Sequence, residues 1–303
     1  MTLGGLVRTA PEPFVYASGD EFGFTFLSDL HIGARNVDYA AMTRDLDRAK
    51  KHGDRINING DVFDGILPSD QKRFLTSALD PRLHGHDDIL NGAIDIGVEI
   101  LSPYAELIDM IGAGNHDDSV LKYHHFDPVL LLVDRLNQHL RSIGSPHVIT
   151  YGGYSGIIDY RFETDAPRCP RIRRFLIFYH HGIGGSGSFS SSAGDFQKFN
   201  FVEGADVLWL GHRHSKMQAT VVRLCFRDNG TVAERPVHFI RTGAYLRTYG
   251  IQHAIDVPRV GRRDNYASVR AYEPQGMGGY RLILSFPTVR SLEVRAESTC
   301  HGG

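Results

Sequence analysis

Short apolar runs and amphipathic stretches alternate along the first half of the chain. Residues 22–28 are rich in aromatic and β-favouring side chains, which predicts a strand. Apolar side chains then recur at helical spacing from Asp38 towards Gly53, so we expect a helix there that ends at the glycine. Residues 55–59 and 107–111 predict two further strands, each followed at once by glycine and polar residues.

Helices are also expected over 87–101 and after Asp127, where Asp-Pro forms a suitable cap and first turn. Strands dominate from residue 147 onward. They are expected at 147–151, 156–162, 174–179, 207–210, 219–226, 237–241, 282–286 and 292–294. This order favours a layered α/β sheet protein. We expect one domain over 1–303, with its motifs in a core of about 22–250. Residues 251–303 would be an extension or would complete a sheet.

Composition narrows the class of protein. The 303 residues carry a formal net charge of −2, so there is no overall attraction for nucleic acid or an anionic membrane. Cys169, Cys225 and Cys300 fit neither a disulfide framework nor a zinc motif, so we expect a reducing compartment, the cytoplasm. No apolar run approaches the roughly 18 residues of a membrane span, so no membrane partner is expected. The oligomeric state stays open.

Five polar motifs follow apolar strands. They are Asp29-Leu30-His31, Gly60-Asp61-Val62-Phe63-Asp64, Gly114-Asn115-His116-Asp117, His180-His181-Gly182 and Gly211-His212-Arg213-His214. In open α/β sheets, ligands bind beyond the carboxyl ends of the strands, so these five strand ends are expected to converge. An isolated motif of this kind is usually an ordinary turn, whereas five in this order favour one shared site.

The side chains in these motifs indicate which ligand belongs there. Carboxylate, imidazole and amide oxygen together suit divalent ions such as Mn, Fe or Zn. The five motifs offer seven such side chains as possible ligands. These are too many for one catalytic ion, but they suffice for two ions that share a carboxylate. We therefore expect two divalent metal ions, with Mn favoured and Fe, Zn, Ni or Co as alternatives. Two ions about 3.5–4 Å apart clamp a phosphate and generate hydroxide near neutral pH.

Together the motifs resemble the signature of the calcineurin-like metallophosphoesterases: D-x-H, G-D-x-x-D, G-N-H-[D/E], a strand-end histidine and G-H-x-H. The resemblance covers residues 22–214. It implies a four-layer αββα sandwich of two mixed β-sheets with a binuclear metal centre at the strand ends. The ligands that it implies are Asp29, His31 and His214 for one ion, Asn115, His212 and one of the paired histidines for the other, and Asp61 as the bridge.

His116 resembles the family's histidine that binds no metal and protonates the leaving-group oxygen or steadies the phosphate, an assistance worth about 10²–10⁴ in rate. In the family that the motifs resemble, the ligand histidine is commonly followed by one variable residue and then by Pro or Gly. This favours His180 over His181 as the ligand, and either Asp117 or Asp64 is expected to orient His116. The residues expected next to the ligands or against substrate are Asp64, Asp117, His181 and Arg35.

The resemblance implies a chemistry more firmly than a substrate. Gly65 stands where the protein Ser/Thr phosphatases of this superfamily place an arginine, which argues against a phosphoprotein substrate. Residues 61–64, with Pro68-Ser69 shortly after, are instead similar to the double-strand-break repair nuclease branch. We therefore predict hydrolysis of phosphodiesters, in a nucleotide or nucleic acid, by metal-generated hydroxide with His116 assisting the leaving group.

Two alternatives remain open. One is a phosphomonoesterase acting on small molecules. The other is a non-catalytic scaffold that keeps the fold for protein binding, which the presence of His116 and every ligand type disfavours. Two groups of arginines offer contacts to a phosphate backbone, although such runs are more often a solvated face. They are Arg161, Arg168, Arg171, Arg173 and Arg174, and then Arg259, Arg262 and Arg263.

Overall fold

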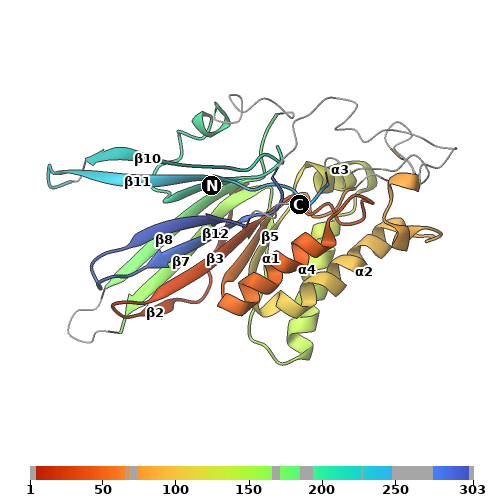
Figure 1. Cartoon of the computed structure of the whole chain (residues 1–303), viewed down its shortest axis with the longest axis horizontal. Helices are drawn as coiled ribbons and strands as arrows, with labels where there is room; N and C mark the ends of the chain where they lie inside the picture. The colour runs from red at the N-terminus through yellow and green to blue at the C-terminus, as the bar shows by residue number, and fades with distance from the viewer. Residues whose placement is uncertain are drawn as a thin grey trace.

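Two β-sheets stacked face to face form the centre of the molecule (Figure 1). The computed structural model describes residues 5–65, 67, 74, 76–165, 171–184, 194–226, 228–247 and 276–299. One sheet has six strands and the other has seven. Both contain parallel and antiparallel pairs, which confirms the expected two mixed sheets.

The six-stranded sheet carries the predicted strand–helix alternation. Its order is β13 (Glu293–Ser298), β12 (Tyr280–Ser285), β3 (Glu21–Leu27), β4 (Arg55–Asn59), β5 (Ile108–Gly112) and β6 (Thr150–Gly153). β3 to β6 are parallel, so their carboxyl ends meet at one edge. β12 runs antiparallel to β3, which brings residues 280–298 into this sheet.

Three helices pack against the outer face of this sheet: α1 (Tyr39–His52), α2 (Ile89–Leu101) and α4 (Pro128–Ser142) (Figure 1). α1 follows the predicted cap, because the Asp38 carboxylate accepts a hydrogen bond from Ala41 N at 3.0 Å. It ends at Gly53, whose φ of 67° is the left-handed conformation common at helix ends. Asp127 caps α4 as predicted. The connections contain the 3-10 turns η1 (Thr76–Ala78), η2 (Pro81–Leu83) and η3 (Ser102–Leu107).

The seven-stranded sheet brings the N-terminal region to the second half of the chain. Its order is β1 (Val7–Thr9), β7 (Ser155–Thr164), β8 (Ile172–His180), β9 (Val207–Leu210), β11 (Val232–Arg241) and β10 (Met217–Phe226), and β2 (Phe14–Tyr16) also pairs with β7. β8 and β9 are parallel, so both end at the same edge. The sequence did not predict β1 and β2, because three residues are too few to display a period.

A largely aromatic core separates the two sheets. Phe26 and Trp209, one from each sheet, are fully buried with ring centroids 4.8 Å apart. The core also accommodates Asn57, an unusual residue in a central strand. Its Nδ2 donates to the Tyr160 hydroxyl at 2.8 Å, and that hydroxyl donates to Asp109 at 2.8 Å. These hydrogen bonds offset part of the cost of burying the amide.

The layer outside the seven-stranded sheet is thin in the described part of the chain. Residues 194–206 cover this face, and Phe196 and Phe199 of this segment pack against Phe239 and Phe178. Helical turns occupy residues 194–197. The histidine pair at the end of β8 therefore lies next to this thin layer on one side and the inter-sheet core on the other.

Further elements differ from the sequence prediction, and β11 begins at Val232 rather than at residue 237. The helix α3 (Asn115–His124) begins inside the third motif and was not predicted. The strand expected from residue 147 begins at Thr150 instead, because Ile149 N donates to Asn137 Oδ1 at 2.8 Å rather than to a neighbouring strand. Side-chain amides compete with the sheet for backbone groups in this way.

Two further expectations concern compartment. Within the described ranges, no helix has the length and apolarity needed to cross a bilayer. Cys225 carries a free thiol, whereas Cys169 and Cys300 lie outside the described residues.

Candidate metal centre

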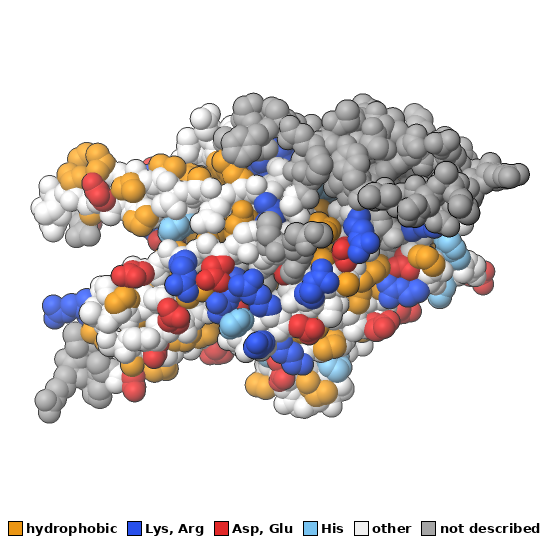
Figure 2. Space-filling model, in the orientation of Figure 1, with side chains coloured by type: hydrophobic (Ala, Val, Ile, Leu, Met, Phe, Trp, Pro, Cys, Tyr) orange, Lys and Arg blue, Asp and Glu red, His pale blue; other side chains and the backbone are white. Residues whose placement is uncertain are grey.

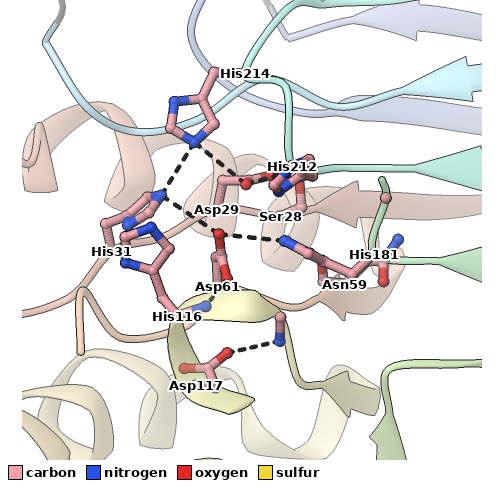
Figure 3. A network of polar contacts seen from close by, with 12 residues as sticks. Ser28, Asp29, His31, Asn59, Asp61, His116, Asp117, His181, His212 and His214 are labelled. Atoms are coloured by element: carbon pink, nitrogen blue, oxygen red, sulfur yellow. Dashed lines mark hydrogen bonds and ion pairs between the residues drawn. The ribbon is translucent and has the colours of Figure 1, made fainter. Parts of the chain in front are cut away.

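The five motifs converge at the carboxyl ends of the strands, as expected (Figure 3). They follow β3, β4 and β5 of one sheet and β8 and β9 of the other. The ends of the two sheets lie together, so side chains from both reach one place. Two of the aspartate–histidine groups that result share Asp61, and a third consists of His31, Asp64 and His116.

The first group consists of Asp29, His31, Asp61 and His214, whose nearest ligand atoms lie within 4.8 Å of one another. The Nε2 atoms of His31 and His214 are 3.1 Å apart. His214 Nε2 is 3.4 Å from an Asp29 oxygen, and His31 Nε2 is 4.0 Å from an Asp61 oxygen. Four potential ligand atoms therefore surround one point.

The second group consists of Asp61, His181 and His212. His181 Nε2 lies 3.2 Å from Asp61 Oδ2. Burial disfavours the charged ring of His181, but the carboxylates of Asp61 and Asp29 outweigh burial and raise its pKa to about 10. Burial likewise opposes ionisation of Asp61, yet the neighbouring His181 and His116 hold its pKa well below the usual value. The low pKa favours the charged form of the carboxylate, which is the form that binds a cation.

Hydrogen bonds fix which ring nitrogen each histidine turns towards this group. His181 Nδ1 donates to the Asn59 carbonyl at 2.9 Å, and His212 Nε2 donates to the Gly184 carbonyl. The opposite nitrogen of His181, Nε2, faces the Asp61 carboxylate, whereas His212 Nδ1 and Asn115 Oδ1 are buried without a hydrogen-bond partner. Buried polar atoms normally have partners. Oxygen and imidazole nitrogen are donors that suit divalent metals, so these residues fit a metal ion.

The structure places the two paired histidines differently. His181, not His180, reaches Asp61. His180 Nδ1 accepts a hydrogen bond from Gly182 N at 3.0 Å, and its ring packs on Phe199 at 5.0 Å. Side chains alternate between the faces of a strand. His180 therefore shares the outer face with Phe178, while His181 continues the inner face towards the site. Burial lowers the pKa of His180 to about 4.

The candidate ligands adopt an uncommon backbone conformation. Of the six described non-glycine residues with positive φ, five are candidate ligands. They are Asp29 (53°), His31 (48°), Asp61 (46°), His212 (71°) and His214 (58°). Such conformations persist where the surroundings enforce them, and they cluster at functional sites. Here Asp29 N donates to the Gly60 carbonyl at 2.9 Å and His31 N to the Asp61 carbonyl at 3.0 Å.

Two glycines allow the loops to approach one another. A Cβ at Gly60 would lie 2.5 Å from His181 Nδ1 and 2.7 Å from the Ala113 carbonyl. A Cβ at Gly114 would lie 2.2 Å from Asp61 Oδ1. Neither distance is compatible with a side chain, so glycine is required for steric reasons at both positions.

His116 lies in the first turn of α3, beside the first group. Its ring centroid is 4.8 Å from that of His31, and its side chain is 23% exposed, so a substrate can reach it. Its Nδ1 donates to the backbone carbonyl of Asp64, so Nε2 is the ring nitrogen that this hydrogen bond does not engage. Burial opposes protonation of the ring, but Asp61 and Asp64 outweigh it and raise the pKa.

Of the two aspartates expected to orient His116, Asp64 does so and Asp117 does not. Asp64 contacts His116 through its carbonyl, and its carboxylate lies 3.4 Å from His31 Nδ1. Asp117 instead accepts hydrogen bonds from the backbone N atoms of Val62 and Phe63, at 3.1 and 3.0 Å. It also accepts one from Gly114 N. Asp117 therefore holds the second and third motifs together.

The expected basic contacts lie elsewhere. Arg35 is exposed, and its Nη1 donates to the Ser77 carbonyl at 3.2 Å rather than to the aspartate–histidine groups. Arg174 pairs with Asp159, and Arg173 donates to the Arg290 carbonyl. Both are near the start of β8, at the opposite end from the site. Arg168, Arg259, Arg262 and Arg263 lie outside the described residues. Figure 2 shows basic and acidic side chains interspersed over one face of the molecule.

Two residues that the sequence did not reveal support the first motif. The Ser28 hydroxyl donates to the Asp29 carboxylate, and Thr242 Oγ1 lies 2.5 Å from the Ser28 hydroxyl. Ser28 stands beside a motif, which is a usable signal. Thr242 does not stand beside any of the five motifs. It follows β11, and the pairing of β11 with β9 brings it to the site.

The family model for calcineurin-like phosphoesterases matches residues 22–216. No match was found among curated proteins. One similar solved structure is a conserved uncharacterized protein from Streptococcus pneumoniae, described as a predicted phosphoesterase. It is 11% identical with a TM-score of 0.32, over 93% of this chain and 92% of that one. Another is GAP50, described as the anchor in the inner membrane complex of Plasmodium, at 10% identity and a TM-score of 0.46, over 92% and 85%.

At these scores neither structural likeness bears on function. The family match is different, because it takes in all five motifs and more than half of the chain. The chain therefore belongs to the calcineurin-like phosphoesterase family.

Proposed function

We propose that this protein is a dinuclear metal-dependent phosphoesterase that hydrolyses phosphodiesters. The position of Asp61 carries the proposal, because this buried carboxylate belongs to the first and the second aspartate–histidine group. A carboxylate in this position can serve two adjacent ions. The residues that would hold the ions are Asp29, His31 and His214 for one, Asn115, His181 and His212 for the other, and Asp61 for both.

The protein's own residues define how a substrate would approach. When bound, two divalent ions supply Lewis-acid polarisation of phosphoryl oxygens and a lowered pKa for water. His31 and His181 are almost completely buried, whereas the side chains of His116 and His214 are 23% and 32% exposed. A phosphoester therefore approaches from the side of His116 and His214.

His116 is the proposed proton donor to the leaving-group oxygen. Its Nδ1 proton is committed to the Asp64 carbonyl, so Nε2 is the nitrogen that faces the substrate. In the metal-free protein burial opposes protonation of this ring, but the carboxylates of Asp61 and Asp64 raise its pKa. Asp64 orients the ring without taking up Nε2. General-acid assistance of this kind is typically worth about 10²–10⁴ in rate.

The preference for diesters rests on the second motif. Gly65 follows Asp64, where an arginine would bind the phosphate of a phosphoprotein, and residues 61–64 resemble the repair nuclease branch. The described arginines of the first basic group lie away from the site, so they give no support to an extended nucleic-acid interface. We therefore favour a nucleotide over an extended nucleic acid as the substrate.

The test compares hydrolysis of bis-p-nitrophenyl phosphate and p-nitrophenyl phosphate by the purified full chain with Mn. The His116→Ala variant gives the background rate. Faster turnover of the diester supports the proposal, and DNA, RNA and cyclic nucleotides would then be tested. Faster turnover of the monoester would make the protein a phosphomonoesterase. Absence of both turnover and metal binding would favour the scaffold.

A further inference from the structure

Asp195 occupies a buried position next to the loop that carries two candidate ligands. It belongs to residues 194–206, outside the seven-stranded sheet, and none of the five motifs includes it. Its side chain is 4% exposed, yet it contacts two guanidinium groups that are themselves 9% and 1% exposed. Burying three charges together is costly unless each is well paired, so the presence of this cluster points to a role beyond stabilising the fold.

The two guanidinium groups belong to Arg213 and Arg241. Arg213 stands between His212 and His214, and its Nη2 donates to Asp195 Oδ1 at 3.0 Å while its Nε faces Oδ2. Arg241, at the end of β11, donates from Nη2 to Asp195 Oδ2 at 3.1 Å. The Asp195 carboxylate is therefore the common acceptor for both.

The loop 211–215 is held on both sides of His214 by this cluster. Arg213 precedes His214 and binds Asp195 directly. Ser215 follows His214, and its hydroxyl accepts from Arg241 Nη1 at 3.4 Å. His212 and His214 both have positive φ, 71° and 58°, which a chain keeps only when its surroundings enforce it. The side-chain anchors at positions 213 and 215 contribute to that enforcement, together with the hydrogen bond from His212 N to the Asp29 carboxylate at 3.1 Å.

We propose that Asp195 is a positioning residue for the metal centre, acting through Arg213 and Arg241 on the loop that carries His212 and His214. This inference rests on the proposed metal centre. His214 belongs to the first aspartate–histidine group and His212 to the second. Loss of the Asp195 charge therefore disturbs both metal positions together, whereas a change at either histidine removes a ligand from one group.

The test measures Mn affinity of the metal-free full chain by isothermal titration calorimetry. Asp195→Asn is expected to weaken binding at both positions by about 10- to 100-fold, the range typical for partners that orient metal ligands. Asp206→Asn is the matched control. Asp206 pairs with Arg235 at 2.8 Å but lies just before β9, at the end opposite to the loop 211–215. The control is expected to bind Mn as the wild type does.

A second variant keeps the test decisive if Asp195→Asn does not fold. Arg213→Lys keeps the charge but loses the two-pronged contact with the carboxylate, and it is expected to weaken both Mn positions as well. The double variant combines Asp195→Asn with Arg213→Lys. If Asp195 acts through Arg213, the affinity of this double variant for Mn is little lower than that of the weaker-binding single variant. Wild-type affinity in a folded Asp195→Asn protein, or an equal loss in Asp206→Asn, would overturn the proposal.

Failure of this inference is distinguishable from failure of the proposed function. A wild-type protein that binds two Mn ions but hydrolyses neither test ester would contradict the proposed function, while weakened Mn binding by Asp195→Asn would still support the role of Asp195. A wild-type protein that hydrolyses the diester, with unaltered Mn binding by Asp195→Asn, would contradict only the positioning role. A wild-type protein that binds no Mn would overturn both.

Discussion

The Nε2 atoms of His31 and His214 lie 3.1 Å apart, although the two residues are separated by 183 positions in the sequence. Two nitrogens bound to one ion at about 2.1 Å each lie roughly 3.0–3.4 Å from one another. A carboxylate oxygen of Asp29 lies 3.4 Å from His214 Nε2. The imidazole pair is thus already arranged for a shared cation, and this arrangement guides the predictions below.

Replacement of His116 by alanine is expected to lower kcat by about 10²–10⁴ without loss of metal. The ring contacts the Asp64 carbonyl and faces the open side of the site. The measurement is steady-state turnover of bis-p-nitrophenyl phosphate together with metal content. His52→Ala, an exposed histidine at the end of α1, is the control and should retain full activity. Full activity in His116→Ala would remove this residue from the mechanism.

Asp61→Asn is expected to lower metal occupancy at both positions, because this carboxylate belongs to the first and the second group. The number of Mn ions bound per chain checks this, measured by elemental analysis after dialysis. Asp118→Asn changes an exposed carboxylate on α3 and serves as the control. Two ions per chain in Asp61→Asn would exclude a bridging role.

The histidine pair gives a direct test of the alternation along β8. His181→Ala is expected to lose metal, because His181 Nε2 lies 3.2 Å from Asp61. His180→Ala is expected to keep the metal and to lose the packing against Phe199 and the hydrogen bond from Gly182 N. Metal content of the two variants is compared under the same conditions. The reverse result would make His180 the ligand.

Gly114→Ala tests how closely the third motif must approach Asp61. The added Cβ would lie 2.2 Å from Asp61 Oδ1 and 2.3 Å from Asp61 N, so the loop must shift. We expect destabilisation of about 1–3 kcal/mol, as for overpacked sites, together with weaker Mn binding. Gly194→Ala meets no atom within 4 Å and is the control. Equal free energies of unfolding for both variants would contradict the steric requirement.

The cap of α1 predicts a pH-dependent contribution to stability. Burial opposes ionisation of Asp38, but hydrogen bonds from Arg247 and from Ala41 N outweigh it and lower its pKa. A lowered folded-state pKa stabilises the protein above the unfolded value, near 3.8, and the gain is lost as pH falls through the folded value.

Asp38→Asn keeps an acceptor for the cap but no charge. The free energy of unfolding of Asp38→Asn should therefore be lower than that of the wild type at pH 6, and this difference should become smaller as the pH is lowered to 3. Asp38→Ala also removes the cap, which costs about 1 kcal/mol more. Urea unfolding of the three proteins at both pH values measures these differences. A constant gap between Asp38→Asn and the wild type would show that the charge contributes nothing.

Much of the fold and of the candidate site follows from local signals in the sequence. The α1 helix lies between Asp38 and Gly53 as predicted, because capping and helical spacing involve residues close together along the chain. The strand predicted at 55–59 coincides with β4, because a strand is also recognised from residues close together along the chain. Each polar motif follows an apolar strand, and parallel strands carry their ends to one edge of a sheet. Convergence of the motifs was therefore predictable without any long-range contact.

The tertiary structure decided what depends on distant residues. Residues 174–179 are almost all apolar, so the sequence showed no alternation that would tell His180 from His181. The choice came from packing, since β8 has buried faces on both sides and only one of them leads to Asp61. Asp195 belongs to no motif, and its role depends on Arg213 and Arg241 folding onto it. Local periodicity fixes which elements form, whereas the partners of a buried charge are fixed only when separate segments pack together.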